Sequence, residues 1–434
     1  MRDLLVVAVV IVSLPVSFFR PWIGVLVWSW LGYMNPHRLT WGFAYTAPLA
    51  EMVALATLIG IPFFRTRFNF PWRKEVFLLL GLWGIFLLST LFSIYPQEAW
   101  PQFSKVSKII LMTFVTIALF RDKEKIRYLL LVIALSIGFF GLKGGVWAIL
   151  TGGQNQVLGP PDSFLAGNTE VGLALNMVLP ILLILRREET RRWIRHLLLA
   201  IFFFSIVAIL ITYSRGAFLG LVAVLSVLFL KSRAKRVALV LIAVGIPLAI
   251  FALPDKWVGR VQTINTYEED ASSMSRILAW KLSWRLGLAH PLVGFGFFPF
   301  TPEIYDQYLP EHTSERRRGA DAHNIFFQVL AEHGFPGLAL YVFLVISTLM
   351  SLGRVIRMAR GDPQKRWLGN YANMIQACLV GFIVNGFFLS RSYFDLFFHF
   401  VAISILLKQL AEEESTETDR TAEIPVAGAL GQRC

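Results

Sequence analysis

The stretch YLLLVIALSIGFFGLKGGVWAIL, residues 128–150, decides the fold class of this chain. Among its 23 residues there is one charged side chain, Lys143. A helix of about 20 apolar residues crosses the hydrocarbon core of a bilayer, so the stretch predicts a membrane-spanning helix. Basic residues precede it, as expected on the cytoplasmic side. They are Arg121, Lys123, Lys125 and Arg127.

The rest of the chain has a similar composition. Of its 434 residues, 56% are hydrophobic and 16% are charged, and the mean hydropathy is +0.61. Soluble domains carry about 25% charged residues. The net charge of +13 would suggest nucleic acid in a soluble protein. Here the basic residues lie between apolar runs, so we expect them to fix the topology and to bind no nucleic acid. Two cysteines, Cys378 and Cys434, build neither a disulfide framework nor a metal cluster.

Apolar runs recur along the chain and predict an all-α integral membrane protein with about 12 transmembrane helices. Arg20-Pro21 interrupts the first run, which is either one broken span or two short ones, and no signal-peptide cleavage site follows it. The runs lie near 4–34, 46–64, 75–95, 105–120, 128–150, 168–185, 196–213, 216–230, 237–253, 335–352, 368–389 and 394–408.

Lys and Arg clusters occupy every second loop, which places those loops and the C-terminal tail in the cytoplasm. The loop 254–334 then lies on the outer side and is long enough to suggest a function. Within it, Leu278, Leu282 and Leu286 recur every four residues, which predicts a helix on the membrane surface. Three serines before this helix are N-cap candidates. They are Ser272, Ser273 and Ser275.

This pattern divides the chain into three parts. Residues 1–194 form N-terminal transmembrane helices, and residues 195–411 form a second transmembrane region that includes the loop 254–334. Residues 412–434 are polar and begin with three glutamates, so we expect a disordered cytoplasmic tail.

Two arginines on the outer side are candidates for binding a phosphate group. Arg215 lies at a tight junction between two apolar runs, where an arginine is costly and by default marks function. Its planar guanidinium matches phosphate geometry, although it could also snorkel to the headgroups. Arg276 lies in the first turn of the predicted surface helix, where free N–H groups favour an anion. The alternative for Arg276 is an ordinary residue of the polar helix face.

His323 is the candidate general base. It stands near the start of the helix that returns to the membrane, and an imidazole accepts a proton near neutral pH. The alternative is a structural histidine that bonds a loop carbonyl. Three further sites keep open roles. Lys143 is a phosphate ligand or a snorkelling side chain, and Asp395 pairs with a basic residue or orients the site. Arg316, Arg317 and Arg318 form a solvated charge run or bind an anionic acceptor such as a phosphorylated sugar. The sequence has neither a nucleotide-binding P-loop nor an outer carboxylate pair, so we expect no metal and no cofactor.

Several short motifs together resemble the bacterial O-antigen ligase and O-antigen polymerase superfamily, most sharply from about 195 to 345. They are Ser214-Arg215-Gly216, Ser275-Arg276, Pro291-Leu292-Val293-Gly294-Phe295-Gly296, Ala322-His323-Asn324 and Glu332-His333-Gly334. Two more, Met34-Asn35-Pro36-His37-Arg38 and Leu142-Lys143-Gly144-Gly145, look like the exosortase-associated branch of putative O-glycosylation ligases.

The resemblance implies a glycosyltransferase of lipopolysaccharide biosynthesis in the bacterial inner membrane, with a periplasmic active site. Its donor is a glycan on undecaprenyl diphosphate, and its acceptor is a hydroxyl of the lipid A core. By this resemblance His323 activates the acceptor, while Arg215 and Arg276 hold the diphosphate, without metal and with inversion. An O-antigen polymerase or a protein O-glycosyltransferase would use the same donor. A flippase or transporter is the alternative from another class, but neither midplane charges nor inverted repeats are evident.

Overall fold

The computed structural model describes residues 1–63, 70–232, 235, 271–310 and 321–422. Every regular element within these ranges is a helix. Eight of the described helices are long and apolar enough to cross a membrane. The chain is therefore an all-α, multi-pass membrane protein.

The eight candidate spans are α1 (Arg2–Phe19), α4 (Lys74–Leu91), α5 (Pro96–Leu119), α6 (Lys123–Leu150), α7 (Asn168–Glu188), α8 (Arg192–Ile211), α14 (Ile325–Met358) and α15 (Arg366–Gly386). The other described helices are α2 (Pro21–Met34), η1 (Pro36–Leu39), η2 (Phe43–Tyr45), α3 (Leu49–Phe63), α9 (Arg215–Lys231), α12 (Ala271–Ala289), α13 (Pro302–Tyr308) and α16 (Asp395–Ala422).

The first apolar run is two helices, α1 and α2, which separate at Arg20. Pro21 begins α2, where its missing N–H costs nothing. The predicted run 237–253 lies outside the described residues, so the count of 12 stays a prediction.

The predicted disordered tail starts too early. Helix α16 continues to Ala422, and Glu412 forms an ion pair with Arg73 beside α4. Residues 412–422 are therefore helical, whereas 423–434 lie outside the described residues.

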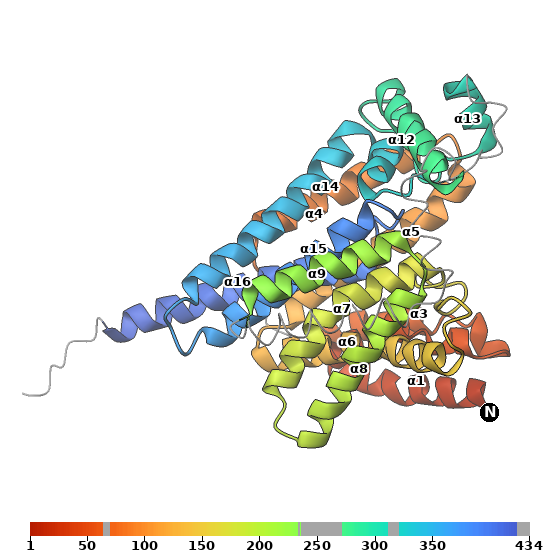
Figure 1. The fold of residues 1–434 in the computed structure, drawn as a ribbon. Coiled ribbons are helices and arrows are strands. Elements are labelled where there is room, and N and C mark those ends of the chain that lie inside the picture. Colours follow the sequence, from red (N-terminus) through yellow and green to blue (C-terminus); the bar gives the residue numbers. More distant parts are fainter. Residues whose placement is uncertain (64–69, 233–234, 236–270, 311–320, 423–434) are drawn as a thin grey trace, which may run out of the picture.

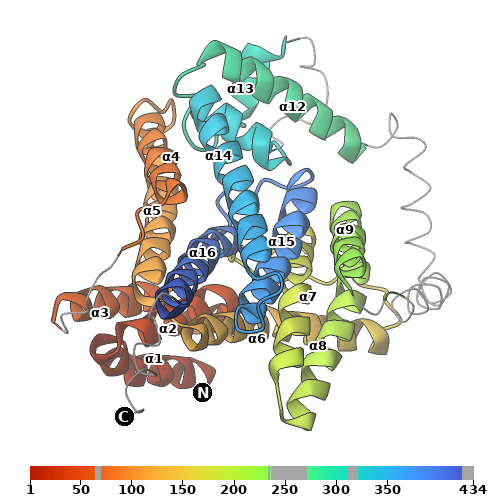
Figure 2. The same cartoon turned by 90° about the vertical axis from the view of Figure 1, so that its left-hand side faces the viewer.

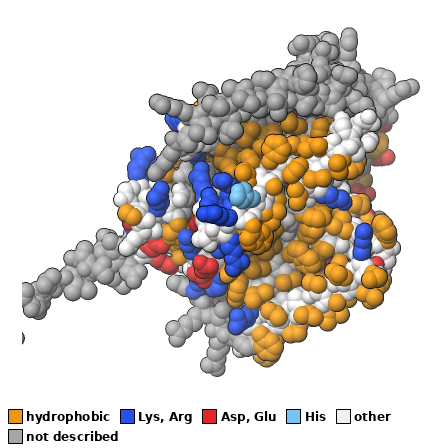
Figure 3. All heavy atoms as spheres, turned by 60° about the horizontal axis from the view of Figure 1, so that its bottom comes forward, with side chains coloured by type: hydrophobic (Ala, Val, Ile, Leu, Met, Phe, Trp, Pro, Cys, Tyr) orange, Lys and Arg blue, Asp and Glu red, His pale blue; other side chains and the backbone are white. Residues whose placement is uncertain are grey.

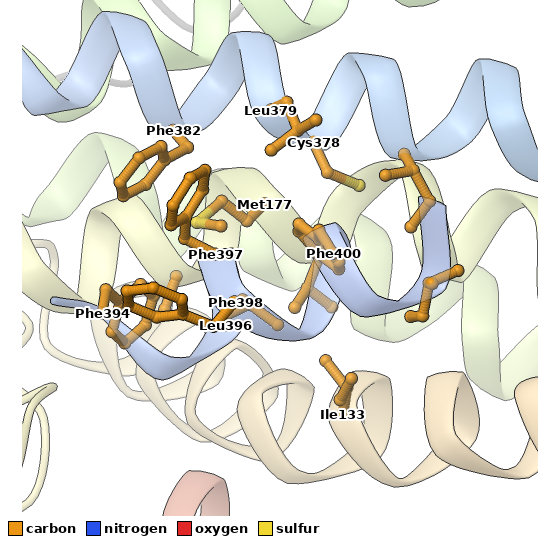
Figure 4. Packing of buried hydrophobic residues seen from close by; sticks show 14 of the residues in the cluster. Ile133, Met177, Cys378, Leu379, Phe382, Phe394, Leu396, Phe397, Phe398 and Phe400 are labelled. Atoms are coloured by element: carbon orange, nitrogen blue, oxygen red, sulfur yellow. The ribbon is translucent and has the colours of Figure 1, made fainter. Parts of the chain in front are cut away.

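Helix α16 forms the centre of the bundle, surrounded by α5, α14 and α15 (Figures 1 and 2). Phe397 of α16 stacks on Phe382 of α15 at a ring distance of 4.8 Å. Met177 of α7 and Cys378 of α15 point into the same apolar cluster (Figure 4). On the outside, hydrophobic side chains cover much of one face, while Lys and Arg gather toward one end of it (Figure 3). A membrane protein shows this pattern where its surface meets lipid and then headgroups.

Helices α12 and α13 lie together at one end of the molecule, at the upper right in Figure 1. The predicted helix around 275–286 is confirmed, but its leucine stripe does not face a membrane. Leu278, Leu282 and Leu286 are buried in a small core with Phe295 and Ala331. The stripe therefore packs α12 against the rest of the protein. The leucine period could not predict this, because leucine is buried equally well in a protein core and in a bilayer.

Candidate active site

The connection between α15 and α16, residues 387–394, is the meeting point of the predicted site residues; we call it the connecting segment. The guanidinium of Arg276 lies 6.0 Å from the ring centroid of Phe388. Gly216, next to Arg215, packs so closely that an added Cβ would lie 2.7 Å from the Cβ of Phe388. The backbone N–H of His323 donates to the Ser390 hydroxyl at 2.7 Å. Helices α9, α12 and α14 thus bring their candidate residues to one short segment.

Arg215 is the first residue of α9, and a tight turn fixes its position. Ser214 caps the helix, because its hydroxyl accepts the N–H of Ala217 at 3.2 Å. The same hydroxyl lies 3.0 Å from that of Thr169 in the first turn of α7. Tyr213 has a φ of +52° and donates its hydroxyl to the carbonyl of Gly153. The turn is therefore tied on both sides, which leaves little freedom at the start of α9.

Arg276 is held near His323 by the next turn of its own helix. Trp280, four residues further along α12, donates its indole N–H to the carbonyl of Ala322 at 2.9 Å. Its ring also stacks on Phe327 at 5.6 Å. Residues four apart share a helix face, so Arg276 lies on the side of α12 that faces the start of α14.

One part of the sequence argument for Arg276 is wrong. Helix α12 already includes Ala271, so Arg276 stands in a later turn and not in the first. Ser272, Ser273 and Ser275 likewise lie inside the helix rather than ahead of it. The free N–H groups of a helix start therefore do not act at Arg276. Arg276 contributes only its own guanidinium charge.

His323 immediately precedes the N-cap of α14. Asn324 is that cap, and its side chain accepts the N–H groups of Phe326 and Phe327 at 2.9 and 3.2 Å. His323 has a φ of +46°, a conformation that few residues adopt without support from their surroundings. Its side chain is half-buried, and its ring makes no hydrogen bond within the part of the chain that the structure describes. The imidazole is thus fixed through its backbone and keeps its nitrogens available.

The electrostatic surroundings of His323 favour the neutral ring. Burial lowers the pKa of His323, and the positive charge of Arg276 lowers it further, while Asp321 and Glu170 oppose them. A neutral imidazole is the form that can accept a proton. The arrangement therefore fits a general base in contact with a cationic site.

Sequence reasoning missed both Glu170 and Arg391. The Arg391 guanidinium donates to the Glu170 carboxylate at 2.8 Å, which joins the connecting segment to α7. Both residues also act electrostatically on His323. Arg391 carried a detectable signal, because it follows an apolar run as Arg215 does.

Two of the family-like motifs build a kink rather than a catalytic group. Gly334 breaks α14 with a φ of +67°, two residues before Pro336. The N–H groups of Phe295 and Gly296 then donate to the carbonyls of Ala331 and Glu332, at 3.0 and 2.9 Å. Loop 291–296 therefore satisfies backbone groups that the kink leaves open.

A buried polar network joins the connecting segment to α14. Tyr393 donates its hydroxyl to Glu332, and His333 Nε2 lies 2.7 Å from that same hydroxyl. The side chain of Gln328 lies 3.3 Å from Glu332 and accepts the hydroxyl of Ser392 at 2.7 Å. Buried polar groups that are paired in this way rigidify their surroundings. The network fixes the connecting segment against α14.

The remaining candidates have different outcomes. Lys143 is an exposed residue of α6, outside the group that meets at the connecting segment. Asp395 is buried at the start of α16, where Lys105 acts on it electrostatically, and its pairing with a basic residue stays a prediction. Residues 316–318 lie outside the described residues. Within the described part of the chain, no three or more His, Cys, Asp or Glu side chains are grouped so that they could hold a metal ion.

Comparison with known families gives two matches. Residues 200–342 match the family described as O-antigen ligase, and this range contains Arg215, Arg276 and His323. Residues 1–190 match a family of unknown function. No curated protein matches the chain. Residues 200–342 thus carry a region similar to the O-antigen ligase family, which bears out the resemblance of the sequence motifs to the O-antigen ligase and polymerase superfamily.

Proposed function

We propose that this protein transfers a glycan from undecaprenyl diphosphate to a hydroxyl of the lipid A core. The reaction takes place at the periplasmic face of the bacterial inner membrane. The observation that carries the proposal is the meeting of Arg276, Gly216 beside Arg215, and His323 at the connecting segment. The match of residues 200–342 to the O-antigen ligase family supports it.

In this mechanism His323 takes the proton of the acceptor hydroxyl as its oxygen attacks the anomeric carbon. The bond between that carbon and the diphosphate oxygen breaks, and attack from the opposite side inverts the centre. Negative charge then grows on the departing diphosphate, where Arg215 and Arg276 stabilise it. Fixed charges in a site with little water do this better than water does. The donor already stores the energy, so neither a metal nor a nucleotide is needed.

The two parts of the chain have different roles in this proposal. Residues 195–411 supply the three reacting groups and the loop 254–334, while residues 1–194 supply packing and Glu170. The orientation with basic loops in the cytoplasm brings α12, α13 and the start of α14 to the periplasm. We keep about 12 spans for the whole chain.

An in vitro assay tests the proposal and identifies the acceptor. The purified protein in lipid, with EDTA present, receives undecaprenyl-diphosphate glycan and one of three acceptors. These are rough lipopolysaccharide, the repeat-unit donor itself, and a target protein. Transfer to lipopolysaccharide is the expected result. Transfer to the repeat unit or to protein would make the chain a polymerase or a protein O-glycosyltransferase, and a need for Mg²⁺ would refute the metal-free mechanism.

A further inference from the structure

A second group of cations reaches the connecting segment from the N-terminal half. Lys105 of α5 places its ammonium 3.8 Å from the ring centroid of Phe164, and Phe164 packs on Phe394 at 6.3 Å. Arg391, Asp395 and Arg38 all act electrostatically on Lys105. Arg391 also acts on His323, so it links this group to the site already described.

Arg38 is held beside this group by its own contacts. Its guanidinium lies 4.7 Å from the ring centroid of Tyr45 and 4.0 Å from the carboxylate of Asp162. The Tyr45 hydroxyl donates to Asp162 at 2.5 Å, so Arg38, Tyr45 and Asp162 all contact one another. Its helix η1 directly follows α2, where an added Cβ on Gly32 would lie 3.4 Å from Asp395 Oδ2. Three elements of the N-terminal half therefore meet at the start of α16.

Lys105 differs from an ordinary lysine of a membrane helix. Its side chain is exposed, yet no ion pair or hydrogen bond of its ammonium occurs among the described residues. Lys108, one turn further along α5, forms an ion pair with Glu51 at 2.5 Å. An ammonium above an aromatic ring, with its three donors open, is suited to bind an anion.

The order of contacts along the connecting segment indicates which substrate carries the anion that would bind Lys105. Arg276 and Gly216 contact Phe388 at one end, His323 bonds Ser390 in the middle, and Phe164 with Lys105 packs on Phe394 at the other end. Figure 2 shows α5 and α9 on opposite sides of α15 and α16. A base acts between donor and acceptor, so cations beyond His323 lie on the side of the acceptor.

We propose that Lys105 and Arg38 form a second subsite, which binds a phosphate or carboxylate group on the acceptor. This gives the region that matches a family of unknown function a direct role in substrate binding. The inference rests on the proposed function, because that reaction defines the acceptor.

The test measures binding and therefore does not depend on transfer. Undecaprenyl diphosphate first saturates the full-length protein in detergent, and glucose 6-phosphate is then titrated as the probe. Lys105→Met and Arg38→Gln should each weaken its binding about tenfold, the loss of one charge-assisted hydrogen bond. Lys108→Met, the matched control on the same helix, should bind like wild type. Equal affinity of wild type and Lys105→Met would overturn the proposal.

A kinetic arm separates this inference from the proposed function. With an acceptor that supports transfer, Lys105→Met should raise the KM for acceptor and leave the KM for donor unchanged. A raised KM for donor instead would place Lys105 with the diphosphate and contradict the inference. If no acceptor supports transfer, the proposed function fails, while the binding titration still decides whether the subsite exists.

Discussion

Among single residues, the proposed mechanism gives His323 the role of general base. We expect His323→Ala to lower the rate of transfer by about 10²–10⁴-fold, the range for loss of a general base. Binding of undecaprenyl diphosphate should stay close to wild type, because the cations that hold it are intact. The measurement compares turnover with donor binding on the same preparation. His196→Ala, an exposed histidine of α8, is the control, and similar rates for both variants would eliminate His323 as the base.

The pKa of His323 gives a second prediction. Since burial and Arg276 lower this pKa below 6.5, the base stays neutral at neutral pH, and kcat/KM should fall only as the pH drops below 6.5. Arg276→Gln removes a positive charge, so the pKa rises and the acid limb should move to higher pH. Arg285→Gln, on the same helix, should leave the limb in place. An unchanged limb in Arg276→Gln would show that another group titrates.

The sequence singled out His323, Arg215 and Arg276 as candidates, because each stands in a short motif on the side predicted to face outward. The position of Arg391 after an apolar run was a detectable signal, but its pairing with Glu170 was not predictable, because the two residues lie 221 positions apart in the chain. Pairing over such a distance depends on how α7 packs against α15 and α16, which periodicity does not encode.

At the scale of elements, the kink in α14 supports the site. Gly334→Ala should destabilise the protein by about 1–2 kcal/mol, the cost of a positive φ for a residue with a Cβ. The added Cβ would also lie 2.6 Å from the carbonyl oxygen of Pro291. Gly353→Ala is the control in the same helix, where the added Cβ would lie 3.7 Å from Gln376 Nε2. Thermal unfolding in detergent measures both, and equal melting temperatures would contradict a required kink.

Helix boundaries and helix faces were predicted unequally well. Arg20-Pro21 indicated the break between α1 and α2, because proline is favoured in the first turn of a helix. The start of α14 near His323 was predicted correctly, whereas the apolar run 335–352 covers only the part of α14 beyond its kink at Gly334. For α12 the apolar period was correct, but a stripe of leucines does not reveal whether lipid or protein covers it.

At the scale of the whole molecule, the topology is open to direct test. In a Cys434→Ser background, where Cys378 is buried, Leu292→Cys and Arg360→Cys report opposite faces. Leu292 is 71% exposed near α12, and Arg360 is exposed between α14 and α15. An impermeant maleimide should label position 292 in intact spheroplasts and position 360 only after lysis. Labelling of both from outside would invalidate the proposed orientation.

In the proposed mechanism, fixed guanidinium groups bind a lipid diphosphate beside an imidazole. A cryo-EM structure of His323→Ala in a lipid nanodisc, with undecaprenyl-diphosphate glycan bound, would show this arrangement. We expect the diphosphate between Arg215 and Arg276 at the connecting segment, with the anomeric carbon turned toward position 323. A diphosphate bound away from both arginines would contradict it.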